Sequence, residues 1–244
     1  MTEEKFGITG LGIMGQNLAL NMERNGAFVV GYDRSAETRT RFGGGPAAGK
    51  NIQMANDIGA FIDALERPRH ILLMVPAGDP VDAAIQELKP WLQPGDLIID
   101  GGNSYFLDTE RRSAALAAEG LHFMGLGVSG GAEGVLWGPS IMAGGDVGSY
   151  RAVEAVLLGI AARAHDGQPC IAYLGPGGAG HYVKMVPKGI DYGDMQLIAE
   201  AYDLLHRGAG VSYERLHVIF SAWNKGGTGL VPDRNHGRYF QPGG

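Results

Sequence analysis

The residues that decide the fold are Gly10-Leu11-Gly12-Ile13-Met14-Gly15. They follow a short apolar run, 6–9, that is typical of a strand, and they open a helical pattern that extends from Met14 to Arg24. The spacing is Gly-x-Gly-x-x-Gly, in which the glycines permit a tight turn and let a pyrophosphate approach a helix amino terminus. Because the motif lies between a strand and a helix, it predicts a dinucleotide-binding loop. The alternative is a glycine-rich turn that binds no ligand.

Outward from this loop, short apolar runs alternate with longer helical patterns. This alternation predicts an α/β fold, a Rossmann-type doubly wound and mostly parallel sheet with helices on both faces. The expected further strands are 27–32, 70–75, 97–100, 121–126 and 171–174. The expected further helices are 57–66, 81–92 and 109–119. A flexible loop is expected at Gly43-Gly44-Gly45-Pro46.

The pattern changes after about residue 178. Apolar residues at helical spacing predict one long helix from about Ala179 to Arg207, and Ser212 is a candidate cap for a second helix that ends near Ala222. No period follows Asn224. We therefore expect a dinucleotide-binding domain at 1–177, a helical segment at 178–225 and a disordered tail at 226–244.

Composition limits the class of protein. The 244 residues include 45% hydrophobic and 19% charged side chains, with a formal net charge of −6. An acidic chain without basic runs is not expected to bind nucleic acid, and without a long apolar run it is not expected to enter a membrane. A single cysteine, Cys170, and an acidic amino terminus fit a cytoplasmic protein. No metal site is expected.

The segment after the second strand bears on the choice of coenzyme. Asp33 favours NAD, because a carboxylate accepts hydrogen bonds from ribose hydroxyls and repels a 2′-phosphate. Arg34 and Ser35 favour NADP, because a guanidinium and a hydroxyl can bind that phosphate. We expect NADP, with NAD left open and a solvated surface position as the alternative for Arg34.

Four motifs follow one another along the chain. They are Gly10-Leu11-Gly12-Ile13-Met14-Gly15-Gln16-Asn17-Leu18, Asp100-Gly101-Gly102-Asn103-Ser104, Gly127-Val128-Ser129-Gly130-Gly131, and Gly180-His181-Tyr182-Val183-Lys184-Met185-Val186 continuing to Gly189-Ile190-Asp191-Tyr192-Gly193-Asp194-Met195-Gln196. In this order they closely resemble the 6-phosphogluconate dehydrogenase family, the decarboxylating oxidoreductases of the pentose phosphate pathway. The similarity extends from about Gly7 to Lys225. The wider β-hydroxyacid dehydrogenase superfamily shares the first three motifs only loosely.

The resemblance implies roles for particular positions, with NADP as cofactor, 6-phosphogluconate as substrate and a homodimer as the assembly. The implied cofactor-binding residues are Gly10, Leu11, Gly12, Ile13, Met14, Gly15, Asp33, Arg34, Ser35, Val75, Pro76, Ala77 and Asn103. The implied substrate-binding residues are Asn103, Ser129, Gly130, Gly131, Pro187, Lys188 and Tyr192.

The resemblance also implies the catalytic pair. Lys184 is at the position of the base that takes the hydroxyl proton, and Asp191 is at the position of the acid that protonates the enediol after carbon dioxide leaves. Seven residues separate them, close to two helical turns, so both are expected on one helix face. A lysine that acts as a base must be neutral, which requires a partly buried amine with a lowered pKa.

Three departures from the family pattern matter. A His-Asn pair expected after the lysine is replaced by Pro187 and Lys188, and the expected glutamate by Asp191. A proline in a helix interior costs about 3 kcal/mol relative to alanine, and a carboxyl group displaced by about 1 Å can cost about a hundredfold in rate. Lys188 disfavours a charged Lys184 and favours a charged Asp191.

The third departure is length. Family members continue after Lys225 into an all-helical domain that makes most of the dimer interface, and this sequence has no such segment. Two alternatives to full activity therefore remain open. One is a truncated or catalytically impaired NADP-binding homologue, and the other is a β-hydroxyacid dehydrogenase with a smaller substrate.

Overall fold

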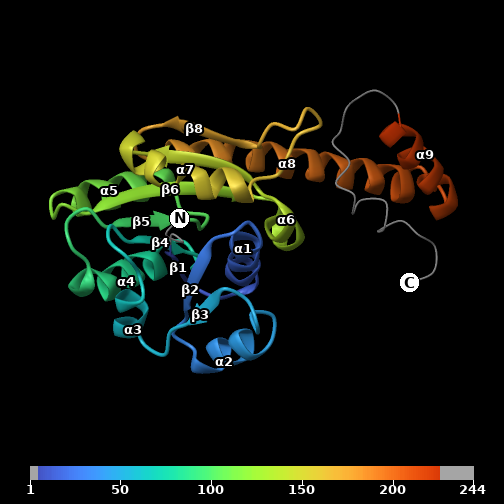
Figure 1. Ribbon diagram of the computed structural model, residues 1–244. Coiled ribbons are helices and arrows are strands. Elements are labelled where there is room, and N and C mark those ends of the chain that lie inside the picture. Colours follow the sequence, from blue (N-terminus) through green and yellow to red (C-terminus); the bar gives the residue numbers. More distant parts are fainter. Residues whose placement is uncertain (1–4, 226–244) are drawn as a thin grey trace. The chain divides into compact units, whose positions relative to one another are not determined.

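A computed structural model describes residues 5–225 (Figure 1). The chain forms two compact units, with the boundary between Val186 and Pro187. The first unit is built on one eight-stranded sheet with the order β3-β2-β1-β4-β5-β6-β7-β8. Neighbouring strands are parallel except for β6 and β7. The predicted fold class, a doubly wound and mostly parallel sheet followed by helices, is confirmed.

The elements of the first unit follow one another in regular alternation up to β6. The strands are β1 (Lys5–Thr9), β2 (Phe28–Tyr32), β3 (Ile52–Met54), β4 (His70–Leu73), β5 (Leu97–Asp100), β6 (His122–Ser129), β7 (Ser140–Gly145) and β8 (Ile171–Gly175). The helices are α1 (Ile13–Arg24), α2 (Ala36–Gly44), α3 (Ile58–Asp63), α4 (Asp79–Leu88), the 3₁₀ turn η1 (Lys89–Trp91), α5 (Phe106–Ala117), α6 (Gly131–Trp137) and α7 (Val147–Ile160).

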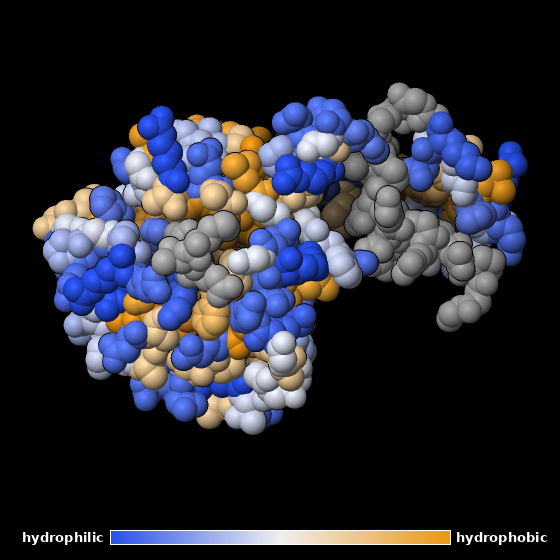
Figure 2. All heavy atoms as spheres, in the orientation of Figure 1, coloured by the Kyte–Doolittle hydropathy of each residue, from blue (hydrophilic) through white to orange (hydrophobic). Residues whose placement is uncertain are grey.

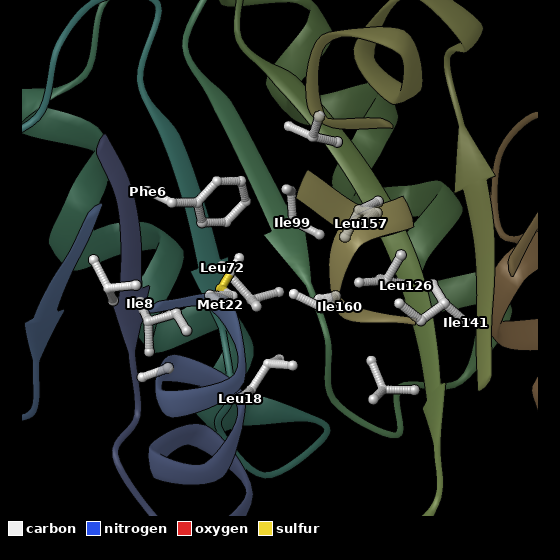
Figure 3. Close-up of a cluster of buried hydrophobic side chains, with 14 of the residues drawn as sticks. Phe6, Ile8, Leu18, Met22, Leu72, Ile99, Leu126, Ile141, Leu157 and Ile160 are labelled. Carbon is white, nitrogen blue, oxygen red and sulfur yellow. The ribbon is translucent and has the colours of Figure 1, made fainter. Parts of the chain in front are cut away.

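The central strands are buried on both faces, as is typical of a parallel sheet between two helical layers. Successive side chains alternate between the layers, so that Leu72 of β4 packs with α1 and α7 on one face. Its neighbours Ile71 and Leu73 pack with α3 and α4 on the other face. Figure 3 shows the first of these two cores, which joins side chains from β1, α1, β4, β5, β6, β7 and α7.

Some elements were missed by the sequence patterns, and one expectation was wrong. Gly43 and Gly44 belong to the last turn of α2, so the loop expected at 43–46 begins only after this helix. In α2 only Phe42 is buried, and its weak apolar periodicity gave no helical signal. Strand β3 has three residues, too few to show a period. β7 and α7 were also not predicted.

The second unit contains most of one long helix and a shorter one. α8 (Ala179–Asp203) continues through Pro187 across the boundary, and a π-helical turn, η2 (Leu204–Gly208), follows it. α9 (Tyr213–Lys225) begins after Ser212, whose hydroxyl accepts a hydrogen bond of 3.4 Å from the amide of Arg215. Both predicted helices are confirmed. The expected tail at 226–244 lies outside the described residues. Within 5–225, no helix has the length and apolar character needed to cross a membrane.

Candidate active site

The glycine loop between β1 and α1 has the geometry that a dinucleotide requires. Gly10 has a φ of 88°, and a Cβ there would lie 2.6 Å from the carbonyl oxygen of Met74. A Cβ on Gly15 would lie 2.0 Å from the carbonyl oxygen of Gly10, so this glycine lets the helix pack against the turn. A Cβ on Gly12 would meet no atom within 4 Å. Gly12 therefore leaves its backbone open to a ligand, as the pyrophosphate of a dinucleotide needs.

The first turn of α1 is electrostatically suited to an anion. Gly12 is the residue before the helix, no side chain caps it, and the first turn carries no acidic residue. Free backbone N–H groups and the helix dipole favour negative charge at this end. The loop also lies where the strand order reverses between β2-β1 and β4, the point at which open α/β sheets bind ligands.

Asp33 joins the glycine loop to the start of α2. One carboxylate oxygen accepts a hydrogen bond of 2.7 Å from the amide of Leu11, and the other accepts one of 2.8 Å from the amide of Ser35. The hydroxyl of Ser35 in turn caps α2 by accepting from the amide of Thr38 at 3.1 Å. Asp33 therefore has a positioning role that the sequence did not indicate. Each of its oxygens keeps a second lone pair for a ligand.

A cavity of about 210 Å³ opens beside this loop. It contains the predicted positions Gly10, Asp33, Arg34, Val75 and Pro76, whereas Ala77 is not among its lining residues. Its full lining is Thr9, Gly10, Tyr32, Asp33, Arg34, Ile58, Val75, Pro76, Pro80, Ala84, Glu87 and Leu88. The mixture of apolar walls and a few polar groups is typical of a small-molecule site.

Within this cavity Glu87 of α4 is a residue that the sequence patterns did not single out. Both Nε and Nη2 of Arg34 lie 2.7 Å from its Oε2, and the hydroxyl of Tyr32 donates to its Oε1 at 3.2 Å. Burial, and then the negative charge of Glu87, raise the pKa of Tyr32. Glu87 and Arg34 are 53 residues apart in the sequence, so no local pattern predicts their contact. The amphipathic character of α4 is the one signal that the sequence offers.

The second group of predicted residues meets where β5 and β6 end. Lys184 of α8 is half-buried, and its Nζ donates to the side-chain oxygen of Asn103 and, at 2.8 Å, to the carbonyl oxygen of Val128. The turn after Ser129 consists of Gly130, with a φ of 145°, and Gly131, with a φ of 62°. The structure therefore brings Lys184, Asn103 and the residue before Ser129 together.

Glycines let α8 lie directly against the sheet at this point. A Cβ on Gly127 of β6 would lie 2.7 Å from the Cβ of Lys184. A Cβ on Gly144 of β7 would lie 2.2 Å from the amide nitrogen of Gly180 in the first turn of α8. Any larger side chain at either position would push the helix away and move the amine of Lys184 with it.

A buried charged network holds the turn that carries Asn103. The carboxylate of Asp100 is fully buried and accepts hydrogen bonds from the amide of Gly102 at 3.0 Å and the hydroxyl of Ser104 at 2.6 Å. Arg112 of α5 lies 3.7 Å from the same carboxylate and 2.8 Å from that of Asp82. Hydrogen bonds from Arg112 are the largest cause that lowers the pKa of Asp82, to about 2.

His181 lies one turn before Lys184 and is 2% exposed. Its Nδ1 lies 2.7 Å from the hydroxyl of Thr109, and its Nε2 has no hydrogen-bond partner. Burial, with a smaller contribution from the charge of Lys184, lowers the pKa of this imidazole. His181 is therefore neutral at pH 7 and adds no positive charge beside the lysine.

Three side chains of α1 join the cofactor loop to α6, the helix that follows the Gly130 turn. Asn17 donates to the carbonyl oxygen of Ala132 at 2.8 Å, and Asn21 donates to that of Val135 at 2.9 Å. Arg24 donates to the carbonyl oxygen of Leu136. Hydrogen bonds therefore join the helix after the glycine loop to the helix after the Gly130 turn.

The remaining predicted residues lie in the second unit, after Val186. Lys188 lies 3.9 Å from the carboxylate of Asp191 and 5.4 Å from the ring centre of Tyr192. Because Lys188 and Asp191 are more than half exposed, this ion pair is worth little in free energy. Pro187 lies inside α8.

The glycine loop, the strand order and the cavity define a Rossmann-type dinucleotide-binding protein with a lysine and an asparagine at the sheet edge. In the described part of the chain, no three His, Cys, Asp or Glu residues are grouped as metal ligands.

Comparison with known proteins then places the chain more narrowly. Residues 5–175 match the NAD binding domain of 6-phosphogluconate dehydrogenase, and residues 180–230 match the C-terminal domain of the same enzyme. The chain belongs to the 6-phosphogluconate dehydrogenase family.

Individual relatives give the extent of the similarity. The chain is 59% identical over 225 residues to the decarboxylating 6-phosphogluconate dehydrogenase of Synechococcus elongatus, which covers 92% of this chain and 48% of that protein. It is 51% identical over 226 residues to the NADP(+)-dependent decarboxylating enzyme of Bacillus subtilis, covering 93% of this chain and 48% of that one. The chain therefore spans about half the length of the curated relatives it matches.

Solved structures agree on the fold. The 6-phosphogluconate dehydrogenase of Plasmodium falciparum, determined alone, with its cofactor NADP+ and with its substrate 6-phosphogluconate, matches with a TM-score of 0.84 and 35% identity, over 91% of this chain and 48% of that one. A 3-hydroxyisobutyrate dehydrogenase from Mycobacterium tuberculosis matches with a TM-score of 0.73 at 23% identity, over 91% of this chain and 71% of that one. The second likeness concerns the fold alone.

Proposed function

We propose that this chain serves in the oxidative decarboxylation of 6-phosphogluconate to ribulose 5-phosphate and carbon dioxide, with NADP as the oxidant. The observation that carries the proposal is the contact of Lys184 with Asn103 and Val128 at the carboxyl edge of the same sheet that holds the glycine loop. The matched relatives named as decarboxylating 6-phosphogluconate dehydrogenases support it.

The residues fit the dinucleotide. The open backbone at Gly12 and the uncapped start of α1 would hold the pyrophosphate, and the cavity beside Asp33 and Arg34 would hold the adenosine end. Bound there, the dinucleotide supplies a hydride acceptor. Asn103, which already contacts the lysine, lies where cofactor and substrate are both expected.

The chain's own groups handle the protons. Lys184 in its neutral form takes the proton of the substrate hydroxyl as that carbon loses hydride and becomes a ketone. The resulting β-keto acid loses carbon dioxide, and the electron pair of the broken bond forms an enediol. Asp191, which is at the acid position of the family motif, then donates a proton to the enediol carbon that lost carbon dioxide, so that one proton is taken and one is returned.

The turn Ser129-Gly130-Gly131 is assigned to the substrate carboxylate. Positive φ values at both glycines turn backbone N–H groups outward, a geometry that binds anions. Lys188 and Tyr192, which contact each other, are assigned to the sugar phosphate end, together with the position of Pro187. The ammonium of Lys188 supplies charge for a phosphate.

Absorbance at 340 nm tests the reaction directly. Purified chain is mixed with 6-phosphogluconate and saturating NADP, and the assay is repeated with NAD. We expect NADPH formation that is lost in Lys184→Met, with Lys89→Met as the control because Lys89 lies on the surface and pairs with Glu119. The triple substitution Pro187→His, Lys188→Asn, Asp191→Glu should raise the rate. Absence of turnover in both the chain and the triple variant contradicts the proposal.

A second candidate is a dinucleotide-binding homologue without turnover. Pro187 and Lys188 favour it, because they stand where the family resemblance implies a histidine and an asparagine, so two hydrogen-bonding groups for the substrate are missing. The same assay, combined with a measurement of NADPH binding, distinguishes an active dehydrogenase from a homologue that only binds the dinucleotide. Binding without turnover, unchanged by the triple substitution, supports this second function.

A homodimer and a cytoplasmic location belong to the main proposal. Large apolar side chains of α8 and α9 are exposed, among them Ile190 at 60%, Leu197 at 65% and Trp223 at 51%. Apolar faces of this kind are covered in an oligomer. Sedimentation of the purified chain tests this part, and a concentration-independent monomer contradicts it.

A further inference from the structure

The cavity beside the glycine loop contains a charge arrangement that bears on coenzyme selection. Arg34 is the positively charged residue among those that line the cavity. Its Nε and Nη2 atoms each lie 2.7 Å from the same carboxylate oxygen of Glu87. Glu87 is anchored from the other side by the hydroxyl of Tyr32 at 3.2 Å. The guanidinium is thus engaged by a carboxylate whose position α4 and β2 determine.

We propose that Glu87 is the specificity-determining residue of this site, because it competes with the 2′-phosphate of NADP for Arg34 and so sets the preference between NADP and NAD. The proposal rests on the dinucleotide site of the proposed function. It adds a residue that belongs to neither the glycine loop nor the 33–35 segment.

The charges that line this part of the cavity set up the competition. Asp33 and Glu87 contribute two carboxylates and Arg34 contributes one guanidinium group, whereas Arg39 is not among the lining residues. Arg39 lies over the ring of Tyr32 at 5.7 Å and donates to the backbone carbonyl oxygens of Asp33 and Arg34, so it serves the local backbone. Arg34 is the group left to bind a phosphate, and it is paired.

The two coenzymes make different demands on this pair. A 2′-phosphate carries about −1.5 to −2 charges, and to reach the N–H groups of Arg34 that Glu87 leaves free it must lie close to two carboxylates beside a guanidinium whose charge Glu87 already balances. A free 2′-hydroxyl carries no charge, and Asp33 retains lone pairs to accept from it. Glu87 therefore weakens NADP binding and leaves NAD binding almost unaffected.

The test is fluorescence titration of the purified chain with NADPH and with NADH. In Glu87→Gln we expect the NADPH dissociation constant to fall about three- to tenfold, the range of one partly screened charge, and the NADH constant to change less than about twofold. Glutamine keeps the side-chain length and an acceptor for the Tyr32 hydroxyl. Glu87→Ser is the second variant and is expected to shift the ratio in the same direction.

The matched control is Glu66→Gln. Glu66 makes the same charge change and is also ion-paired, 4.0 Å from Lys5, the first residue of β1. It therefore lies at the amino end of the sheet, whereas the glycine loop follows the carboxyl end of β1. The NADPH-to-NADH ratio should not change in this variant. An equal shift in Glu66→Gln overturns the proposal, because it marks an effect of net charge alone.

Removing Arg34 tests the mechanism. We compare the effect of Glu87→Gln on the logarithm of the NADPH dissociation constant in two backgrounds. In Arg34→Ala this effect should be less than half of the effect in the parent chain. An unchanged NADPH-to-NADH ratio in folded Glu87→Gln and Glu87→Ser, judged by circular dichroism, overturns the assignment of Glu87. Failure of the parent chain to bind either nucleotide is a different result, and it contradicts the dinucleotide site itself.

Discussion

The two units of the chain differ sharply in how far they bury their apolar residues. In residues 5–186, side chains such as Phe6, Leu72 and Leu157 are fully buried in two cores. Among the described residues after Val186, Leu216 is the one buried side chain. Figure 2 shows hydrophilic residues over much of the visible surface of the first unit, interrupted by apolar patches. The first unit thus holds its fold by packing within one chain, whereas α8 beyond Pro187 and α9 bury little apolar surface within the single chain.

The largest test of this difference uses one leucine from each unit. Leu157→Ala in α7 removes a fully buried side chain and should cost about 2–5 kcal/mol of unfolding free energy. Leu197→Ala in α8, where the side chain is 65% exposed in the single chain, should change it by less than about 0.5 kcal/mol at protein concentrations at which the chain is a monomer. Urea unfolding followed by circular dichroism measures both. A loss above about 2 kcal/mol in Leu197→Ala indicates that another surface covers α8 in solution.

The first unit also depends on buried polar contacts, and Asn21 is the clearest of them. It is fully buried and donates to the carbonyl oxygens of Val135 and Ile160 at 2.9 and 3.0 Å. Asn21→Ala should cost about 1–3 kcal/mol, because it leaves both oxygens without this donor. Asn17→Ala, which removes one exposed hydrogen bond, should cost less than about 1 kcal/mol. Equal losses in thermal unfolding contradict the assignment of the larger role to Asn21.

The two units should also differ in how much their ion pairs contribute to stability as the pH changes. The pKa of Asp82 is lowered from 3.8 to about 2, so its stabilisation is present above about pH 4 and is lost as pH falls toward 2. That shift corresponds to about 2.4 kcal/mol without screening. Since the side chain is 36% exposed, about 1 kcal/mol is expected.

The measurement is urea unfolding of the parent chain and Asp82→Asn at pH 7 and at pH 2. The difference between them should be present at pH 7 and mostly lost at pH 2, near the pKa of the folded chain. Asp191→Asn, which breaks the exposed pair with Lys188, should leave the stability unchanged at both pH values. A difference for Asp82→Asn that persists at pH 2 rules out the charge as its cause.

The smallest expected effect concerns the helix itself. A Cβ on Gly193 of α8 would meet no atom within 4 Å, so Gly193→Ala should stabilise this helix by about 0.5–1 kcal/mol. Hydrogen exchange of the amides near Gly193 should slow about two- to fivefold. The amides of β4 and β5 serve as the control and should exchange as before, since they belong to the packed unit. Slower exchange in both places indicates that the two units unfold together.

Much of the fold was predictable because its signals are local. Apolar runs at 70–75 and 97–100 predicted β4 and β5, and the glycine loop predicted the start of α1. α2 was missed because only one of its residues is buried, and β3 because three residues show no period. The candidate site followed the same rule, since Gly10, Gly12 and Gly15 belong to one local motif.

What lay beyond sequence reasoning depends on residues that meet only after folding. The sequence could name Lys184 and Asn103 from family motifs, but their contact across 81 residues depends on glycines in β6 and β7 that let α8 lie on the sheet. No sequence pattern indicates which glycine of a strand leaves room for a helix to pack against it.

The sequence by itself determined the alternation of strands and helices, the glycine loop and the family, because each depends on neighbouring residues or on a short motif. The tertiary structure decided which charges meet. It placed Glu87 on Arg34 across 53 residues and Arg112 between Asp82 and Asp100. Electrostatic energy depends on distance in space, and only the packing of α4 and α5 against the sheet sets those distances.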